Sequence, residues 1–377
     1  MTKDPNTSPI DKSLEERLKD ELPVQLIETN TEKTPFKVDV AVLLLFFTRT
    51  KHTVITFNQI RKARPSKLFL YQDGPRQGRV DDEKNIKECR EAIEAMIDWN
   101  CEVHRLYQTK NYGCDPSEFL SQKWMFSYVD KGIIIEDDDV MSESFFPFCK
   151  ELLDKYENDT RINMICGQNH LGTYNANGAD YIFCRGGSIW GWATWKRTID
   201  SWDPLYRFIN DSYAMKCLEK QKGKKSLNSF VNTCKLHKST GKEYYESIRN
   251  ANQFVNNQLN IVPTKNMCCN IGIGSETTHS VASITFLSRA LRPNLFAKTY
   301  EIFLPLTPPN YVIEDKIYQQ KYRDKAKGGL LSRTFQLRRI ESLIYRVFPI
   351  LGRIGSSSDI KRVQKIMSSA EEIIHQF

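Results

Sequence analysis

The sequence predicts an α/β protein with an open, mostly parallel sheet and helices packed on both of its faces. Short apolar runs that suit buried strands alternate with segments of helical spacing between Val38 and Gly167. This β-α alternation is typical of doubly wound sheets, in which ligands bind beyond the carboxyl ends of the strands. With 377 residues, of which 40% are hydrophobic, the chain can bury one large core or two modest ones.

The first elements follow from local patterns. Val38–Phe47 is a continuous apolar run, which predicts a buried strand. Thr50–Arg64 carries apolar residues at helical spacing and predicts a helix. Lys67–Gln72 predicts a second strand, because the turn-forming Asp73–Pro75 follows it directly. Asp81–Trp99 predicts a helix with an aspartate as its cap and isoleucines and a methionine facing inward.

The later elements continue the alternation. Glu102–Tyr107 alternates between apolar and polar residues and predicts a third strand. The dipeptide Asp115-Pro116 predicts the start of a helix, since proline in the first turn loses no hydrogen bond. Gly132–Glu136 and Arg161–Gly167 predict the fourth and fifth strands, with a helix over Ser144–Tyr156 between them.

Charge and cysteine content exclude several classes of protein. The net charge is +8, and residues from Ser288 to the end hold 16 Lys and Arg against 8 Asp and Glu. The part before Ser288 is therefore near neutral, and no basic nucleic-acid-binding surface is implied there. The ten cysteines form no C-x-x-C spacing and no Cys/His cluster typical of zinc. With no signal peptide and no apolar run of membrane-spanning length, a cytoplasmic location with reduced thiols is expected.

Four consecutive acids, Glu136 to Asp139, follow the expected strand Gly132–Glu136. Adjacent carboxylates repel one another, so the cluster needs a cation or hydrogen-bond donors to neutralise it. Carboxylates suit hard divalent cations, and such a cation could hold a diphosphate at this sheet edge. The alternative is a solvated acidic loop, which would be the better interpretation of an isolated acidic run. No G-x-G-x-x-G motif or P-loop is present, so a dinucleotide or ATP-cradling site has no support.

Six motifs in order resemble one family. They are FFTRTKHT (46–53), YQDGPR (71–76), NYGC (111–114), IIIEDDDV followed by FFPF (133–148), IWGWATW (189–195) and NIGIGSETTHS (270–280). Together they resemble nucleotide-sugar-dependent glycosyltransferases of the GT-A fold, in particular bacterial enzymes similar to animal N-acetylglucosaminyltransferase I. The resemblance runs from about Val38 to about Asp315. It implies a UDP-sugar donor, a glycan or lipid-linked glycan acceptor and inversion at the anomeric carbon.

The resemblance also implies roles for the residues near the donor. It places Arg49 near the nucleotide, although a surface salt bridge is its ordinary role. It makes Asp73 the acceptor of a uracil N–H, although an aspartate there can simply cap the turn. It makes Asp138 a direct ligand of Mn²⁺ or Mg²⁺, while Glu136 and Asp137 hold hydroxyls of the sugar or ribose. Because side chains alternate along an extended strand end, Glu136 and Asp138 are expected on one side and Asp137 on the other. Asp139 is extra to the motif, and solvation is its simplest explanation.

One histidine and two tryptophans are further candidate site residues. His279 matches a late histidine that binds the metal in many such enzymes, while a hydrogen-bonded structural histidine is the equal alternative. Imidazole would favour Mn²⁺ over Mg²⁺. The tryptophan block could be only core, but indole stacks on sugar C–H faces. By resemblance, Trp190 and Trp192 are expected beside the donor sugar and acceptor, whereas Trp195 is expected to pack.

An inverting transferase needs a general base for the acceptor hydroxyl. Counting back from Asn256–Pro263 places Glu246 at the family's base position. Relatives usually carry Trp-Asp there, so the chain departs from the pattern in both residues. Glu243 is the substitute candidate, and an acid on a solvated helix face remains the alternative.

Three parts are expected along the chain. Residues 1–35 form a polar segment with one short helical stretch, residues 36–315 the GT-A catalytic domain, and residues 316–377 a basic, partly amphipathic helical tail. Apolar residues between Leu337 and Leu351 recur at steps of three and four, with arginines among them. Packing on the catalytic domain is the commoner explanation for such a helix. The other is peripheral contact with the inner face of an anionic membrane.

The predicted function is transfer of a hexose or N-acetylhexosamine from a UDP-sugar to a glycan hydroxyl. Two alternatives stay open. A metal-dependent phosphohydrolase would use the same acids but needs a second cluster of carboxylates or histidines for a two-metal site, which the sequence does not obviously supply. A sugar-nucleotide-binding protein without activity is suggested by the altered base motif.

Overall fold

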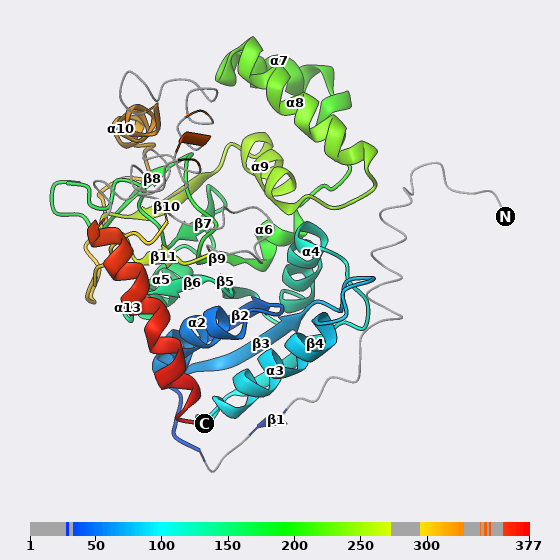
Figure 1. The fold of residues 1–377 in the computed structure, drawn as a ribbon. Helices are drawn as coiled ribbons and strands as arrows, with labels where there is room; N and C mark the ends of the chain where they lie inside the picture. The colour runs from blue at the N-terminus through cyan, green and yellow to red at the C-terminus, as the bar shows by residue number, and fades with distance from the viewer. Residues whose placement is uncertain are drawn as a thin grey trace.

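The computed structural model describes residues 28–29, 33–272, 295–327 and 357–377, together with residues 340, 343–344 and 347. Within these ranges the chain forms a mixed α/β structure with one large central sheet (Figure 1). The strands of this sheet are β1 (Glu28–Thr29), β2 (Val38–Phe46), β3 (Pro65–Gln72), β4 (Glu102–Tyr107), β5 (Lys131–Glu136), β7 (Ile162–Cys166), β8 (Tyr181–Cys184), β9 (Trp192–Trp195) and β10 (Leu259–Pro263).

The nine strands lie in the order β1-β4-β3-β2-β5-β9-β7-β10-β8. The block β4-β3-β2-β5 is parallel, β9 runs antiparallel between β5 and β7, and β10 is parallel to β7. The short end strands β1 and β8 are antiparallel to their neighbours. This arrangement confirms the predicted α/β class and is consistent with the Rossmann-like order expected of a GT-A fold.

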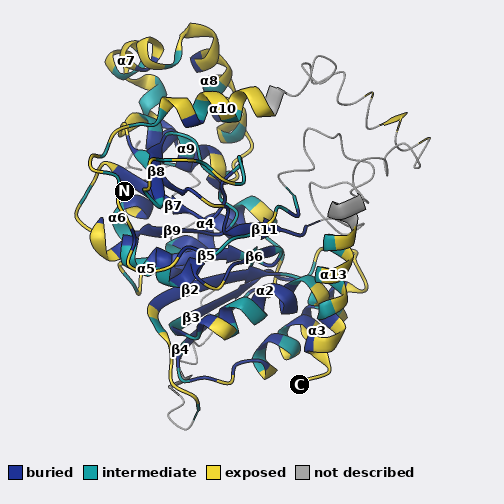
Figure 2. Ribbon diagram, turned by 90° about the vertical axis from the view of Figure 1, so that its left-hand side faces the viewer, coloured by how far each residue is buried: buried dark blue, intermediate teal, exposed yellow. Residues whose placement is uncertain are grey.

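Helices cover both faces of the sheet, as Figure 2 shows by the buried strands between them. One apolar core lies between the sheet and the helices α2 (Thr50–Ala63), α3 (Asp82–Ala95) and α5 (Phe145–Lys155). The second core lies on the opposite face, under α4 (Cys114–Met125), α6 (Lys196–Asp200) and α9 (Tyr245–Val255). Strand residues alternate between the two: Val42 and Leu44 enter the first core, whereas Leu43 and Leu45 enter the second.

The predicted elements match those observed, apart from their ends. The largest difference is in the helix predicted over Asp81–Trp99, because α3 ends at Ala95. The Trp99 indole is fully buried and donates to the Pro65 carbonyl at 2.8 Å, while its backbone forms a β-bridge with Thr34. The chain therefore turns out of the helix in order to reach the edge of the sheet.

The polar segment predicted over residues 1–35 joins the edge of the sheet near its end. β1 pairs with β4, and the Asn100 backbone N–H donates to the Thr34 carbonyl at 2.7 Å. The boundary predicted at residue 35 therefore falls within a part of the chain that packs on the edge of the sheet.

A small second sheet joins β6 (Asp139–Met141) to β11 (Cys268–Asn270) in antiparallel pairing. β6 begins inside the run of four acids, so this pairing brings the segment around Asn270 onto that run. Beyond α6, the 3₁₀ turn η1 (Arg207–Asn210) leads into α7 (Ser212–Lys222) and α8 (Lys224–Ser239). These two helices stand at one end of the molecule, beyond α9 (Figure 1).

The C-terminal helices do not form a separate tail. α10 (Lys316–Lys327) inserts Tyr318 into the second core, and α13 (Ser357–Ile374) runs along α2, with Ala370 and Ile373 buried in the first core (Figure 1). The boundary predicted at residue 316 therefore does not separate a tail from the α/β domain. Most of the amphipathic stretch predicted over residues 337–351 lies outside the described residues.

Candidate functional site

The predicted acids lie at the point where the order of the parallel strands reverses. From β2 the chain moves to β3 and β4 on one side, and then returns to β5 on the other side of β2. In open α/β sheets this reversal leaves a crevice at the carboxyl ends of the two central strands. Arg49 follows β2 and Glu136 ends β5, so both stand at this crevice.

Arg49 neutralises two of the four acids. Its guanidinium forms an ion pair with Asp137 and donates to the Asp138 carboxylate at 2.9 Å. The side chains of all three residues are at most 16% exposed. Burial raises the pKa of Asp137, and the Arg49 charge opposes that rise. The requirement for neutralising groups, inferred from the run of acids, is thus partly met by the protein itself.

The predicted alternation of the acids is wrong. The strand ends at Glu136, and Asp137 and Asp138 form a turn before β6 begins at Asp139. A turn changes the direction of successive side chains, so Asp137 and Asp138 both reach Arg49 instead of pointing to opposite sides. Asp137 is 5% exposed and paired, which leaves it poorly placed to hold a sugar or ribose hydroxyl as predicted.

Asp139 is a buried structural acid rather than a solvated one. It has no exposed surface, and its carboxylate accepts from the Gly191 N–H at 2.7 Å and the Asn270 amide at 3.1 Å. The same amide donates to Asp138 at 2.8 Å, so Asn270 joins two acids. Gly191 has a φ of +57°, and a Cβ there would lie 2.4 Å from the Met141 sulfur, which explains glycine at this position.

Glu136 differs from its three neighbours. Its half-buried carboxylate accepts no hydrogen bond from any residue that the structure describes. Burial raises the pKa of Glu136 well above its ordinary value, and the nearby charge of Glu118 adds to the rise. Of the four acids, Glu136 is therefore the one whose carboxylate oxygens are both without a hydrogen-bond donor among the described residues.

Glu118 is a site residue that the sequence analysis missed. It lies on α4 at 4% exposure and accepts from the Gln122 amide at 3.0 Å. Burial raises the pKa of Glu118 to about 8, and the charges of Asp139, Asp115 and Glu246 act in the same direction. The signal in the sequence is the i, i+4 spacing to Gln122, which supplies a donor within a helix buried on all sides.

The two candidate bases differ in accessibility. Glu246 is exposed in the first turn of α9, where the helix dipole favours a carboxylate. Burial raises the pKa of the adjacent Tyr245 hydroxyl, and the charges of Glu136 and Glu118 add to it, which places this end of α9 close to the acids. Glu243, by contrast, is only 1% exposed.

Asp73 holds two loops together. Its two carboxylate oxygens accept four backbone or side-chain N–H groups, from Gly74, Asn111, Tyr112 and Gly113, at 2.9 Å. A carboxylate offers about four acceptor positions, so these donors use the group fully. Burial nevertheless raises the pKa of Asp73 to about 7. The structure shows the turn-capping contacts of Asp73, and its reading of a uracil N–H stays a prediction.

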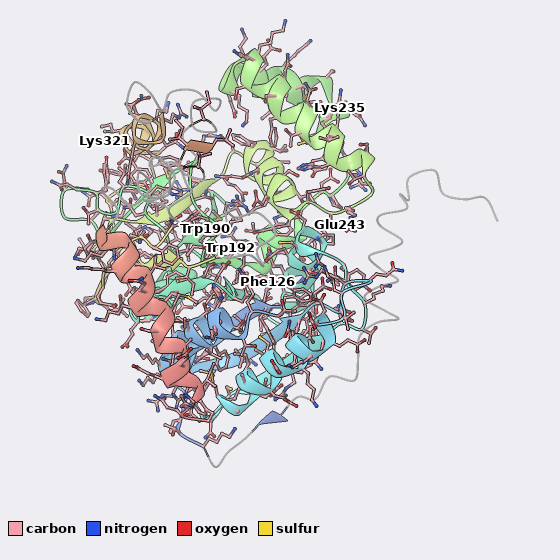
Figure 3. The ribbon with its side chains drawn as sticks, in the orientation of Figure 1. Phe126, Trp190, Trp192, Lys235, Glu243 and Lys321 are labelled. Atoms are coloured by element: carbon pink, nitrogen blue, oxygen red, sulfur yellow. The ribbon has the colours of Figure 1, made fainter. Side chains whose placement is uncertain are left out.

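The burial of the three tryptophans agrees only in part with the prediction. Trp192 is 1% exposed and sits within the second core, so its ring packs rather than facing a sugar. Trp195 packs as predicted, and its indole donates to the Leu153 carbonyl at 2.9 Å. Trp190, labelled in Figure 3, is half-buried and packs against the first core, so part of its surface stays accessible.

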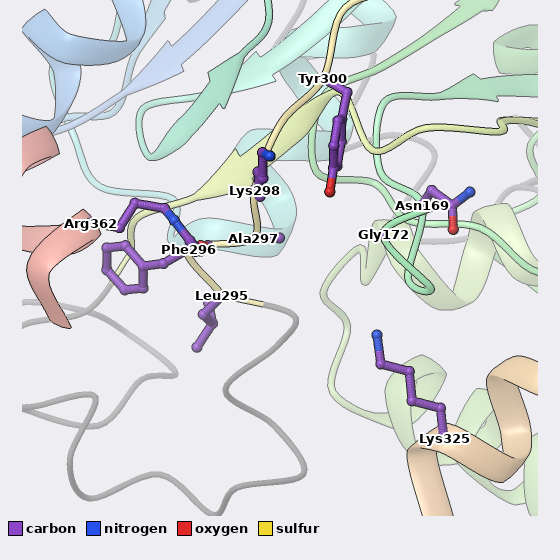
Figure 4. Close-up of a pocket in the computed structure, with 9 residues that line it drawn as sticks. All are labelled: Asn169, Gly172, Leu295, Phe296, Ala297, Lys298, Tyr300, Lys325 and Arg362. Atoms are coloured by element: carbon purple, nitrogen blue, oxygen red, sulfur yellow. The ribbon is translucent and has the colours of Figure 1, made fainter. Parts of the chain in front are cut away.

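A basic cavity of about 190 Å³ lies near the same rim of the sheet (Figure 4). Lys298, Lys325 and Arg362 line it, and Phe296, next to Leu295, forms its apolar wall. Arg362 donates to the Phe296 carbonyl at 2.6 Å, and the Phe296 N–H donates to the Asn270 carbonyl at 2.9 Å. A continuous chain of contacts thus connects α13 to the acids through Asn270.

The proposed metal ligands are only partly covered by the structure. His279 lies outside the described residues. Among the residues that are described, no three His, Cys, Asp or Glu side chains converge as a metal-binding group. No helix in the described ranges is long and apolar enough to cross a membrane.

Comparison with known proteins gives distant structural matches. No protein-family model and no curated protein match the chain, while 78 chains among the solved structures do. The glycosyltransferase GlyE of Streptococcus pneumoniae TIGR4 aligns over 57% of this chain and 43% of its own, at 10% identity and a TM-score of 0.27. A UDP-glucose pyrophosphorylase complexed with UDP-glucose aligns over 61% and 92%, at 10% identity and a TM-score of 0.31. At these TM-scores neither match decides the function, which has to be argued from the site.

Proposed function

We propose that this protein is a glycosyltransferase that moves a hexose or N-acetylhexosamine from a UDP-sugar to a glycan hydroxyl, with inversion. One observation supports it most: an acidic cluster stands at the reversal of the strand order and is held by an arginine that follows the neighbouring strand. The six ordered sequence motifs that resemble GT-A enzymes agree with this placement. The donor class and the stereochemistry rest on that resemblance.

Glu136 and Asp138 are the residues proposed to face the donor. Glu136 has unused carboxylate oxygens, and Asp138 retains further acceptor positions beside Arg49 and Asn270. One or two carboxylates with two phosphate groups form a usual oxygen set for Mg²⁺ or Mn²⁺, so the residues fit such an ion. When bound, the ion would offset the charge that grows on the departing diphosphate. Arg49 can move from Asp138 to a phosphate oxygen and add a second positive charge.

Glu246 is proposed as the general base. It would accept the proton of the acceptor hydroxyl while the hydroxyl oxygen bonds to the anomeric carbon and the bond from that carbon to the diphosphate oxygen breaks. Glu246 is preferred to Glu243 because an exposed carboxylate can reach an acceptor that a residue at 1% exposure cannot.

A panel of nucleotide-sugars tests the proposal. The purified protein is incubated with each sugar in the presence of Mn²⁺ and with a chelator, and free nucleotide and transferred sugar are measured. Metal-dependent nucleotide release from a UDP-sugar, absent in Asp138→Ala, is expected. Release of phosphate from simple phosphoesters would instead favour a phosphohydrolase, and binding without release would favour an inactive sugar-nucleotide-binding protein.

A further inference from the structure

The helices α7 and α8, with the turn that ends at Lys242, form an uncompensated basic surface. Residues 212–242 contain eight lysines, no arginine and a single acid, Glu219. The chain before Ser288 is nearly neutral as a whole. This segment nevertheless carries a strong local excess of positive charge, which acids in other parts of that region offset in the net charge. We call this segment the lysine-rich pair. Seven of its eight lysines are exposed: Lys216, Lys220, Lys224, Lys225, Lys235, Lys238 and Lys242.

These seven lysines lack the acidic partners that several lysines on other helices have. Lys84 and Lys87 on α3, Lys150 on α5 and Lys196 on α6 each form an ion pair with an acid four residues later. In the part of the chain that the structure describes, no carboxylate lies within 4.0 Å of any of the seven. Like charges that are left together on one element repel, so an external anion would stabilise them.

The eighth lysine holds the pair in place. The Lys222 ammonium lies 3.0 Å from the centre of the Phe254 ring on α9 and 4.8 Å from that of Phe230 on α8. Burial lowers the pKa of Lys222 to about 8. Leu218, Leu227 and Val231 form a small apolar cluster between the two helices. The lysine-rich pair is thus anchored to α9 and presents its other lysines outward; Figure 3 shows Lys235 at its surface.

Two apolar side chains stand among the lysines. Tyr213 is 76% exposed and Leu236 is 64% exposed. Exposed aromatic and aliphatic residues beside lysines are the combination that binds the headgroup region of a membrane, where the ring or chain enters the lipid boundary and the ammonium groups contact phosphates. Lysines act as point charges, whereas bidentate recognition of individual phosphates favours arginine, which this segment lacks.

From these observations we infer that the lysine-rich pair is a docking surface for an anionic phospholipid membrane. Each lysine near an anionic membrane surface increases the partitioning of a protein from water onto that membrane by about fivefold. A few of the seven lysines therefore suffice for reversible binding. The inference does not depend on the proposed function. It differs from the predicted membrane contact through residues 330–377, because it assigns the contact to another part of the chain.

The test uses the full-length protein and sedimentation with vesicles of phosphatidylcholine, alone or with 30% phosphatidylglycerol. Binding to the anionic vesicles only, and its loss in 0.5 M NaCl, are expected. Changing Lys216, Lys224, Lys225 and Lys235 to Gln should reduce binding at least tenfold. The control changes the paired Lys84, Lys87, Lys150 and Lys196 to Gln, which alters the net charge equally but should leave binding within about twofold.

A second variant separates a membrane from a soluble polyanion. Tyr213→Ser with Leu236→Ser keeps every charge, so it should weaken vesicle binding several-fold and leave binding to soluble polyphosphate unchanged. Equal losses in the two lysine variants, or binding to polyphosphate or RNA without binding to anionic vesicles, would overturn the inference. Circular dichroism and thermal melts of each variant confirm that a loss is not due to unfolding.

Discussion

The Arg49 guanidinium donates to the Asp138 carboxylate at 2.9 Å and forms an ion pair with Asp137, so one cation from the end of β2 holds the turn that follows β5. These two strands are neighbours in the sheet but lie almost 90 residues apart in the chain. The pair therefore joins the two sides of the crevice by a contact that exists only in the folded protein. It also brings a positive charge to the position where a donor diphosphate is proposed to bind.

Arg49→Met should destabilise the protein by about 3–5 kcal/mol, because it leaves the buried Asp137 without its counter-charge. Chemical denaturation at pH 7 measures this change. The control is Arg61→Met: the pair of Arg61 with Asp98 is more exposed, at 27% and 46%, and should cost less than about 1 kcal/mol. Similar losses in the two variants would show that Arg49 does not stabilise the acidic turn.

Removing the divalent ion should abolish nucleotide release, and adding Mn²⁺ should restore it. Asp138→Asn should lose at least about 100-fold in turnover and no longer bind UDP more tightly when the metal is present, since a neutral amide is a weak ligand for a hard cation. Calorimetry of UDP binding with and without Mn²⁺ checks the second point. Asp98→Asn, on the surface, should behave as the parent protein.

Glu246→Gln should retain UDP-sugar binding but lose transfer by roughly 100-fold or more, because the amide cannot accept the hydroxyl proton. Glu243→Gln serves as the comparison, since Glu243 is buried and its replacement should act mainly on stability. Binding and transfer are measured separately on both variants. Normal transfer by Glu246→Gln would remove this residue from the mechanism.

Glu118 should make the protein less stable as the pH rises. Its folded-state pKa of about 8 lies above the ordinary value of 4.5, so between these limits the folded state binds more protons than the unfolded chain. The free energy of unfolding therefore falls as pH rises from about 5 to about 8. The variant Glu118→Gln lacks the ionisable carboxyl, so its stability does not fall in this way. Relative to the parent it should become more stable as the pH rises over that range, by an amount on the order of a few kcal/mol.

The comparison is made at pH 5, 6.5 and 8 by urea denaturation. The quantity compared is the difference in unfolding free energy between the parent and Glu118→Gln. Burial lowers the pKa of His170 to about 4, so His170 makes both proteins more stable as the pH rises, and this effect cancels in the difference. A difference that stays constant with pH would mean that Glu118 titrates normally.

Ile373→Ala should cost about 2–5 kcal/mol, because Ile373 is 6% exposed within the core under α13. Ile374→Ala, at an adjacent position that is 37% exposed, should cost much less. Thermal or chemical unfolding measures both. Equal and small effects would mean that α13 is a detachable tail rather than part of the domain.

The candidate site could be predicted only in part. Asp73 and the four acids follow predicted parallel strands, so the sequence placed them on one rim, because the carboxyl ends of parallel strands must meet at the same edge. The hydrogen-bond donors of those acids could not be predicted, since Asn270 and Gly191 reach them from other parts of the chain. The like charge of Glu118 near Glu136 could not be predicted either, because it lies on another element. Turn capping by Asp73 was among the sequence interpretations, but its contact with a second loop was not, since three of its four donors lie on Asn111–Gly113.

By itself the sequence determined what depends on local patterns: the α/β class, nearly every strand and helix between Val38 and Cys166, and the acidic end of β5. Apolar periodicity and turn residues act over a few positions, so they can be read along the chain. Tertiary structure alone decided which acids are neutralised, that α13 belongs to the domain, and that the lysines of α7 and α8 stay unpaired. These properties depend on contacts between segments distant in the chain, which local patterns do not specify.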